Sequence, residues 1–597
     1  MKDFFKFMFA SCLGGVLLIV SAVLLVTTCN ALKGDKTAIS SDSVLEIDLD
    51  NAVPELTGNT EGGGTKIFEE KAVGLSDYKR LLAHAKTDPK IKGVFMRSRS
   101  LAMGFSTASQ LRAALEDFKA SGKFVYAFAD YYSQGAYYMA SVANSVWVSP
   151  TGAIDFRGLA FDAPFLKEGL DRLGVKMQIY YAGKFKSATE SLRLNAASPE
   201  NKEQTRVYLE DILGQMLADV SRTRGIEVGE LRNISNNFLA RSANDAVRLR
   251  LADSIGYLDQ AIASMNQKMG KGSLDKIKLV AANDYLGSFD KNLGSGSEKI
   301  AVVYAEGSIG DGNGKEGGSI EGNYYAQLIR NIRRDKNVKA IVLRVNSGGG
   351  SAIGSDMIRR ELEMARAEGK SVMVSMGDYA ASGGYYIALA SDSIFAQSNT
   401  LTGSIGVFSV IPCFQKMLKD KLGVTFDTIK TGKYSALMST MREFSADEGL
   451  ILQAQTDSIY EDFLRKVAAS RHKTRDQIHE IAQGRVWTGR TALQNGLVDK
   501  IGSLDDAIAA AASKSGLKKY KIKEYPEKGE PIQKFLDNLT GKKEKGSSIE
   551  TQMTANMREQ MLREELGEFY GAYAQIKNLQ KMNGVQARLL FMPSQRW

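Results

Sequence analysis

The chain has 597 residues, enough for three or four typical domains or for two large ones. Apolar residues make up 44% and charged residues 24%, which is ordinary for a globular protein with a sizeable core. The net charge of +10 is spread along the chain, so the sequence predicts no nucleic-acid-binding surface and at most a mild preference for anionic membrane. Its three cysteines form no disulfide framework and no Cys/His cluster with metal spacing, so we expect no metal and no cofactor.

The first segment is apolar and uncharged from Phe7 to Thr28, and at about 20 residues such a run is long enough to cross a bilayer. A cleaved signal peptide is the alternative, but the run is long for one and no A-x-A site follows it. Lysines flank the run on both sides and do not decide its orientation. Residues 1–36 are therefore predicted to be an uncleaved anchor in the inner (plasma) membrane, with the rest of the chain on the outer, periplasmic face.

An internal repeat organises most of the remaining chain. Three pairs of segments match at an offset close to 248: Asp130–Tyr138 with Asp378–Tyr386, Leu173–Ala188 with Leu422–Ala436, and Leu251–Ile262 with Leu497–Ile508. We predict a first repeat over 37–297, a second over 298–520 and a C-terminal extension over 521–597.

Both repeats alternate apolar strands with amphipathic helices, which favours α/β units with largely parallel sheets. In the second repeat the pattern predicts a strand at Ala340–Val345, a helix at Asp356–Glu368 and a later helix over Asp447–Val467. In the extension it predicts a helix over Ile549–Met582 and a last strand within Gly584–Phe591, to which no chemistry is assigned.

Ser382 lies where a predicted strand, Ser371–Met376, turns through two glycines into a predicted helix that begins near Tyr385. Such a turn exposes a hydroxyl beside free backbone N–H groups and the positive end of a helix dipole, which suits a nucleophile. Serine is also a favoured helix N-cap, so this turn alone does not separate the two roles.

A second glycine turn, Asn346–Ser351, follows the strand Ala340–Val345. It lacks the Gly-Lys-Ser/Thr ending of a phosphate loop, so nucleotide binding is not favoured. Its glycines permit the close backbone approach that an oxyanion-binding site needs, although a simple tight turn has the same composition.

The two repeats have kept complementary parts of one site. Opposite Ser382 the first repeat has Gln134, which cannot act as a nucleophile, and opposite Gly350 it has approximately Met103, so the glycine turn is absent. Conversely, the first repeat has Lys186 where the second has Tyr434 on an ungapped count. The pattern predicts one composite site, with its serine from the second repeat and its lysine from the first.

With these motifs the chain resembles the signal peptide peptidase A family of membrane-anchored bacterial serine proteases, in its long, duplicated form. The resemblance rests on Ala380–Tyr385, Asn346–Gly350 and Leu401–Gly406 and covers nearly the whole chain. It implies tandem Clp protease/crotonase-like domains and a Ser–Lys dyad. Matched residue by residue, it makes Ser382 the nucleophile and Lys186 the general base. It further makes Gly350 and Gly383 the oxyanion-hole donors and Ser404 the residue that orients the lysine.

Two features depart from the family pattern. Gly348 stands where the family usually has proline, and Lys433 lies one residue from the lysine position of the second repeat, which makes it a rival base. A lysine acts as a base near neutrality only if burial lowers its pKa from about 10.4.

The predicted function is that of a membrane-anchored serine endopeptidase that cuts short hydrophobic peptides, as the family cuts spent signal peptides. Its expected partners are peptide substrates, membrane lipid around the anchor and, by resemblance, three further copies in a homotetramer. Two alternatives stay open: an acyl-CoA hydratase or isomerase, because crotonases share the fold, and a catalytically inactive membrane scaffold.

Overall fold

The structure is a computed structural model that describes residues 38–58, 72–291, 293–314, 319–527 and 586–588. The predicted anchor at 1–36 and the predicted helix over Ile549–Met582 lie outside these ranges. Among the described residues, no helix combines the length and the apolar character needed to span a bilayer.

The first repeat is built on a sheet of six parallel strands in the order β6-β4-β3-β2-β1-β7. The strands are β1 (Ser43–Ile47), β2 (Ile91–Met96), β3 (Phe124–Tyr132), β4 (Ser145–Ile154), β6 (Ser254–Ile255) and β7 (Lys278–Ala281). The helices are α2 (Leu75–Thr87), α3 (Phe105–Lys119), α4 (Gln134–Ala140), α5 (Lys167–Leu173), α6 (Glu190–Arg193), α7 (Pro199–Arg224), α8 (Val228–Asn236), α9 (Ala243–Arg248), α10 (Leu258–Lys268) and α11 (Ala282–Gly287).

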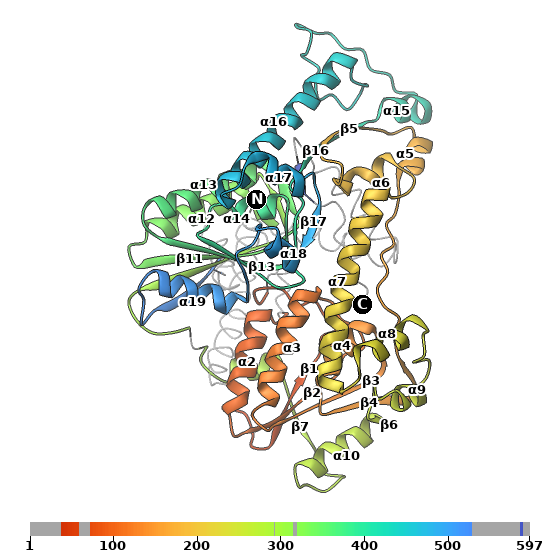
Figure 1. Cartoon of the computed structure of the whole chain (residues 1–597), viewed down its shortest axis with the longest axis vertical. Coiled ribbons are helices and arrows are strands. Elements are labelled where there is room, and N and C mark those ends of the chain that lie inside the picture. The colour runs from red at the N-terminus through yellow and green to blue at the C-terminus, as the bar shows by residue number, and fades with distance from the viewer. Residues whose placement is uncertain (1–37, 59–71, 292, 315–318, 528–585, 589–597) are drawn as a thin grey trace, which may run out of the picture.

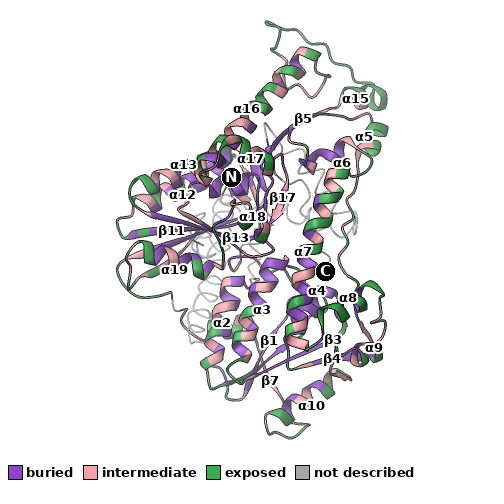
Figure 2. Ribbon diagram, viewed as in Figure 1, coloured by how far each residue is buried: buried purple, intermediate pink, exposed green. Residues whose placement is uncertain are grey.

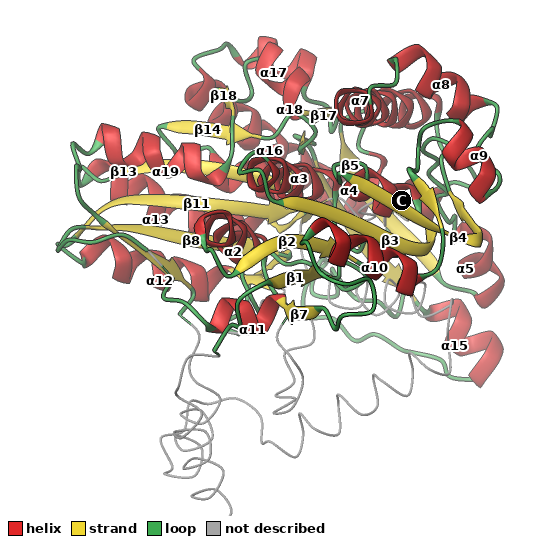
Figure 3. Ribbon diagram, turned by 90° about the horizontal axis from the view of Figure 1, so that it is seen from below, coloured by secondary structure: helices red, strands yellow, loops and turns green. Residues whose placement is uncertain are grey.

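Helices cover both faces of this sheet, as a parallel sheet requires (Figure 3). Neighbouring strand residues alternate between the faces: Val94 packs in the large core with α2, α3 and α7, whereas Phe95 packs with Ala261 and Met265 of α10.

The second repeat has a sheet in the order β17-β15-β13-β11-β8-β19, with β14 and β18 beside β13. Its strands are β8 (Lys299–Glu306), β11 (Val338–Ser347), β13 (Ser371–Ala381), β14 (Ser393–Ala396), β15 (Leu401–Gly403), β17 (Val486–Thr488), β18 (Lys500–Ile501) and β19 (Lys521–Tyr525). Its helices are α12 (Gly322–Arg334), α13 (Ala352–Ala367), α14 (Gly383–Ala388), α15 (Gln415–Leu422), α16 (Ala446–Arg471), α17 (Arg475–Ile481), α18 (Gly489–Gln494) and α19 (Leu504–Lys514).

The predicted strand and helices of the second repeat correspond to β11, α13 and α16, and the α/β class is confirmed. The central strands β11 and β13 are buried along nearly their whole length (Figure 2). One face of the sheet packs against α19 and the other against α12, α13 and α16. The last strand, β19, continues this sheet just beyond the predicted boundary at residue 520.

A third sheet joins the two repeats, with the order β10-β9-β12-β20-β16-β5. Its strands are β5 (Lys176–Ala182), β9 (Ser308–Gly310), β10 (Ser319–Glu321), β12 (Gly349–Ser351), β16 (Val407–Cys413) and β20 (Gln586–Arg588). β5 leaves the first repeat and pairs antiparallel with β16 of the second, from Ala182 opposite Val407 to Lys176 opposite Cys413 (Figure 1). This pairing places the residues that follow β5 in the first repeat against the second repeat.

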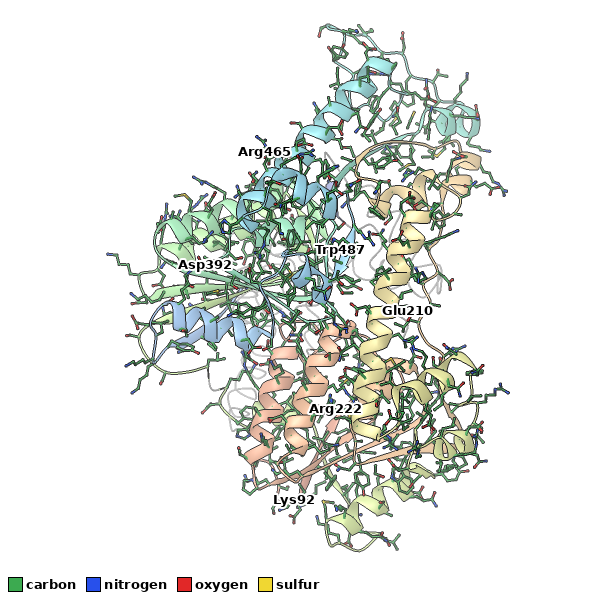
Figure 4. All side chains as sticks on the ribbon, in the orientation of Figure 1. Lys92, Glu210, Arg222, Asp392, Arg465 and Trp487 are labelled. Carbon is green, nitrogen blue, oxygen red and sulfur yellow. The ribbon has the colours of Figure 1, made fainter. Side chains whose placement is uncertain are left out.

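The long helix α7 also connects the repeats, and Glu210 and Arg222 mark two points along it in Figure 4. Its C-terminal half contributes to the core of the first repeat, while the side-chain oxygen of Gln204 accepts a hydrogen bond from the backbone N–H of Val486 in β17 at 3.2 Å.

Buried polar contacts fasten the same interface. Arg344 on β11 donates two hydrogen bonds of 2.9 Å to the carboxylate of Glu55, and neither side chain is more than 2% exposed. Asp378, near the end of β13, accepts hydrogen bonds from the backbone N–H of Thr107 at 2.8 Å and from its hydroxyl at 2.6 Å. Because Thr107 lies in the first turn of α3, the first repeat braces the strand that leads to Ser382.

Candidate active site

The turn at Ser382 has an unusual backbone. Strand β13 ends at Ala381 and α14 begins at Gly383, so the predicted strand-to-helix turn is present. Ser382 itself has φ 56° and ψ −116°, in a region that residues other than glycine rarely adopt and that costs about 1–3 kcal/mol. The turn is held by two hydrogen bonds of 2.8 Å, from Ser382 N–H to the carbonyl of Gly403 and from Tyr386 N–H to the carbonyl of Ser382.

Lys186 reaches this turn from the first repeat. It follows β5 by four residues, and its Nζ lies 2.9 Å from Oγ of Ser382. The same nitrogen lies 3.0 Å from Oγ of Ser404 and donates to the Ser404 carbonyl at 3.2 Å. Three of the five predicted site residues therefore form one hydrogen-bonded cluster, assembled from both repeats.

Burial changes the acid–base behaviour of this lysine. Lys186 is 1% exposed, and its pKa falls from 10.5 to about 7 because burial penalises the charged amine. Its hydrogen-bond partners are hydroxyl and carbonyl groups, which carry no negative charge to hold the proton. The ring of Phe408 lies 6.0 Å from Nζ. A substantial fraction of neutral amine is thus present at physiological pH.

Ser404 also sits in a turn with positive φ, at 50°, directly after Gly403 with φ 76°. Its N–H donates to the carbonyl of Arg485 at 2.7 Å, and the N–H of Gly484 donates to the carbonyl of Ile405 at the same distance. This loop therefore fixes both the hydroxyl and the carbonyl that face the lysine.

Sequence reasoning missed the role of Gly484. It has φ +79°, and a Cβ there would lie 2.7 Å from Cα and Cβ of Lys186, so only glycine lets the two backbones approach. Gly183 makes the reciprocal approach, because with φ +106° its Cβ would lie 2.4 Å from the carbonyl carbon of Gln483. No signal in the sequence pairs these glycines, since the contact joins segments that are far apart in the chain.

The two predicted oxyanion-hole glycines lie on neighbouring elements, Gly383 on α14 directly after Ser382 and Gly350 on β12. Gly383 is the first residue of α14, and N–H groups in the first turn of a helix have no helical acceptor. Gly350 lies on β12, where a Cβ would come within 2.0 Å of the carbonyl oxygen of Ile309. The backbone geometry at Gly350 accordingly excludes a side chain.

The rival base and the first-repeat counterpart of the nucleophile have other environments. Lys433 is exposed and forms an ion pair with Asp447, which raises its pKa, the opposite of what a base at neutral pH requires. Gln134 is buried, and its side-chain oxygen accepts hydrogen bonds from the N–H groups of Arg157 and Gly158 at 2.9 and 2.8 Å. In the first repeat, the position equivalent to Ser382 therefore holds a glutamine whose side chain binds the backbone.

The described residues include no group of three or more His, Cys, Asp or Glu side chains that could hold a metal ion.

Comparison with known proteins gives the chain its family. The pattern of peptidase family S49 matches it twice, over residues 117–271 and 364–518. Among curated proteins, Protease 4 of Haemophilus influenzae is 35% identical over 82% of each chain. The chloroplastic serine protease SPPA of Arabidopsis thaliana is 33% identical over 76% of this chain and 68% of its own. A shorter relative, the putative signal peptide peptidase SppA of Enterococcus faecium, is 35% identical over 39% of this chain and 68% of its own.

Among solved structures, ClpP1 from Listeria monocytogenes matches 34% of this chain and 91% of its own, with 17% identity and a TM-score of 0.22. A TM-score this low supports no conclusion about the fold. The family assignment rests on the two segments that match the family pattern and on the long relatives. The chain belongs to peptidase family S49 and is a serine protease of the long, duplicated form.

Proposed function

We propose that the protein is a membrane-anchored endopeptidase that works through a Ser–Lys dyad, with Ser382 as nucleophile and Lys186 as general base. The observation that carries the proposal is the 2.9 Å separation of Ser382 Oγ and Lys186 Nζ, with neither side chain more than 1% exposed. The lowered pKa of Lys186 supports it, because a base must be neutral before it accepts a proton.

The geometry suits acyl transfer in two steps. Ser382 Oγ attacks the peptide carbonyl carbon while its proton moves to Lys186 Nζ, and the carbonyl oxygen becomes an oxyanion near the N–H groups of Gly350 and Gly383. The C–N bond then breaks, and Lys186 returns the proton to the leaving amine. Water then attacks the acyl carbonyl carbon while the neutral amine of Lys186 takes its proton. The ester C–O bond breaks, the peptide acid leaves, and Lys186 returns the proton to Oγ of Ser382. Ser404 keeps Nζ aligned through both steps.

We further propose that the substrates are short hydrophobic peptides such as released signal peptides. The printed name of the Enterococcus faecium relative supports this substrate class. The uncharged run Phe7–Thr28 supports a single membrane anchor with the catalytic repeats on the periplasmic face. Assembly as a homotetramer, and a Clp protease/crotonase-like fold for each repeat, are proposed on the resemblance described above.

The test combines a fluorophosphonate probe with cleavage of a quenched hydrophobic peptide. Wild type should be labelled and active, Ser382→Ala should lose both properties, and Lys186→Ala should lose activity. Lys433→Ala is the matched control and should behave like wild type. Loss of activity in Lys433→Ala with retention in Lys186→Ala would refute the dyad. An inactive scaffold would leave the wild type unlabelled, and an acyl-CoA hydratase or isomerase would turn over acyl-CoA without Ser382.

A further inference from the structure

The loop between α17 and β17, residues 482–485, is held in an unfavourable backbone conformation. Gln483 has φ 50°, in the left-handed region that residues other than glycine rarely adopt, and the next residue, Gly484, has φ 79°. A residue with a side chain is strained in that region, so the conformation persists only where the surrounding structure holds it in place. The contacts of Gln483 therefore determine whether the loop keeps its shape.

The position of Lys186 depends on this loop. The carbonyl of Gln483 accepts a hydrogen bond from the N–H of Phe185 at 2.9 Å, and Gly484 packs directly against the backbone of Lys186. The carbonyl of the residue after Gly484 accepts a hydrogen bond from the N–H of Ser404 at 2.7 Å. One short segment thus contacts the backbone beside the proposed base and the backbone of the serine that orients it.

The N–H of Gln483 is held from the opposite direction by Tyr460. This tyrosine lies on α16 and is 6% exposed, and its hydroxyl oxygen accepts a hydrogen bond from the N–H of Gln483 at 3.2 Å. The same oxygen lies 3.1 Å from Nδ1 of His479 on α17. Burial raises the pKa of Tyr460 to about 12, so the hydroxyl keeps its proton, which it donates to Nδ1 when that nitrogen is unprotonated. Because α16 and α17 pack side by side (Figure 1), the loop is fixed by a pair of helices.

We infer that Tyr460 is a positioning residue for the general base: its hydroxyl holds Gln483 in the left-handed conformation, and this loop in turn holds the backbone of Lys186. The inference rests on the proposed function, since it takes Lys186 as the base. Without the hydroxyl, the N–H of Gln483 loses its partner and the strained loop relaxes. The amine of Lys186 is then displaced from Oγ of Ser382 for part of the time, and water reaches it.

Tyr460→Phe removes the hydroxyl and keeps the ring, and Tyr325→Phe is the matched control. The hydroxyl of Tyr325, on α12, is also buried and donates to the carbonyl of Tyr304 at 2.8 Å. In cleavage of a quenched hydrophobic peptide, Tyr460→Phe should lower kcat about tenfold or more and leave KM within about twofold, because alignment of the base is lost but peptide binding is not. Tyr325→Phe should keep both constants within about twofold of wild type.

The pH profile separates positioning from a general loss of structure. An amine that is less completely enclosed is better solvated, so in Tyr460→Phe the midpoint of kcat/KM against pH should move upward from near 7 toward 10.5. The loss of kcat/KM should therefore be smaller at pH 9 than at pH 7. A variant that merely folds less well would lose the same factor at every pH, and that result would overturn the inference.

Glycine at residue 483 provides a rescue, because glycine adopts the left-handed conformation without strain. Tyr460→Phe/Gln483→Gly should regain about fivefold of the kcat that Tyr460→Phe loses. The control is Tyr460→Phe/Arg250→Gly, in which glycine relieves another positive φ, 60°, in the first repeat and should restore no kcat. Equal recovery in the two double variants, or recovery in neither, would overturn the inference.

Failure of the inference is distinguishable from failure of the proposed function. If Ser382→Ala and Lys186→Ala are inactive while Tyr460→Phe has the kcat and the pH midpoint of the Tyr325→Phe control, the dyad stands and the inference fails. A wild type that cleaves no peptide, or a Lys186→Ala variant that still cleaves it, would refute the proposed function and the inference with it.

Discussion

Replacing Lys186 by methionine should abolish activity and make the protein more stable at neutral pH. The amine has a pKa of 10.5 in the unfolded chain and about 7 in the folded protein. Between these two pH values the unfolded chain holds a proton that the folded protein has released. The free energy of unfolding of the wild type therefore rises with pH across this window, and the lysine destabilises the fold most at low pH.

The magnitude follows from the two pKa values. Their difference, 10.5 minus 7, is about 3.5, and each pKa unit corresponds to about 1.4 kcal/mol. Allowing for partial protonation, the buried amine costs about 4 kcal/mol at pH 7 and about 2 kcal/mol at pH 9. Methionine has no such cost but leaves the hydroxyl of Ser404 without this partner, a loss of about 1 kcal/mol. The variant should be about 3 kcal/mol more stable at pH 7 and about 1 kcal/mol at pH 9.

The change of about 2 kcal/mol between the two pH values is the diagnostic quantity, because packing effects of the substitution cancel in it. Urea unfolding should compare Ser382→Ala with Ser382→Ala/Lys186→Met at pH 7 and pH 9, in a background that cannot digest itself. Lys433→Met in the same background is the control. Its amine is exposed and stays protonated at both pH values, so it should show no such change.

A methionine variant whose stability relative to its parent is the same at pH 7 and pH 9 would refute the reasoning. That result would show that the folded protein holds the amine in its charged form between pH 7 and pH 9.

Three further outcomes are expected. Peptidase kcat/KM should rise with pH through a midpoint near 7, because only neutral Lys186 accepts a proton. Well below pH 7 it should fall about tenfold for each pH unit. A kcat/KM that does not change between pH 5 and pH 8 would contradict the role of Lys186 as base. Gly484→Ala should lower kcat far more than the control Gly369→Ala. Both glycines have positive φ, but a Cβ at residue 484 would contact Lys186, whereas a Cβ at residue 369 would have no atom within 4 Å. Glu55→Gln should destabilise the protein by about 3–5 kcal/mol in chemical unfolding, because it leaves the buried charge of Arg344 without its carboxylate; a loss below about 1 kcal/mol would show that the pair does not hold the repeats together.

The local structure around Ser382 could be predicted because its signals are local. An apolar run, a small hydroxyl residue and two glycines specify a buried strand, a sharp turn and a helix start, and β13 and α14 follow that order. The positive φ of Ser382 was not predictable, because it is imposed by hydrogen bonds to Gly403 and Tyr386. Serine has no intrinsic preference for that conformation.

Apart from the family resemblance, the lysine could be singled out only because the chain contains two copies to compare. No periodicity or spacing distinguishes Lys186 from the other lysines, and the presence of Tyr434 at the matching position was the one indication in the sequence. For Gly484, which packs against Lys186, the comparison of the two repeats gave no indication of a role. What makes the lysine a base is burial, and burial is produced by long-range pairing of β5 with β16.

Long-range pairing also explains why the sequence predicts a C-terminal strand but not the strands with which it pairs. The sequence indicates that Gly584–Phe591 has strand character, but a strand's partners are chosen by whichever edges are free, and edges are a property of the folded sheet. Here β5 pairs with one side of β16 and β9 with one side of β12, and β20 pairs with the other side of each. The duplicated chain thus builds one site from a strand and a lysine of the first repeat and a serine of the second, and none of these long-range pairings can be predicted from local sequence signals.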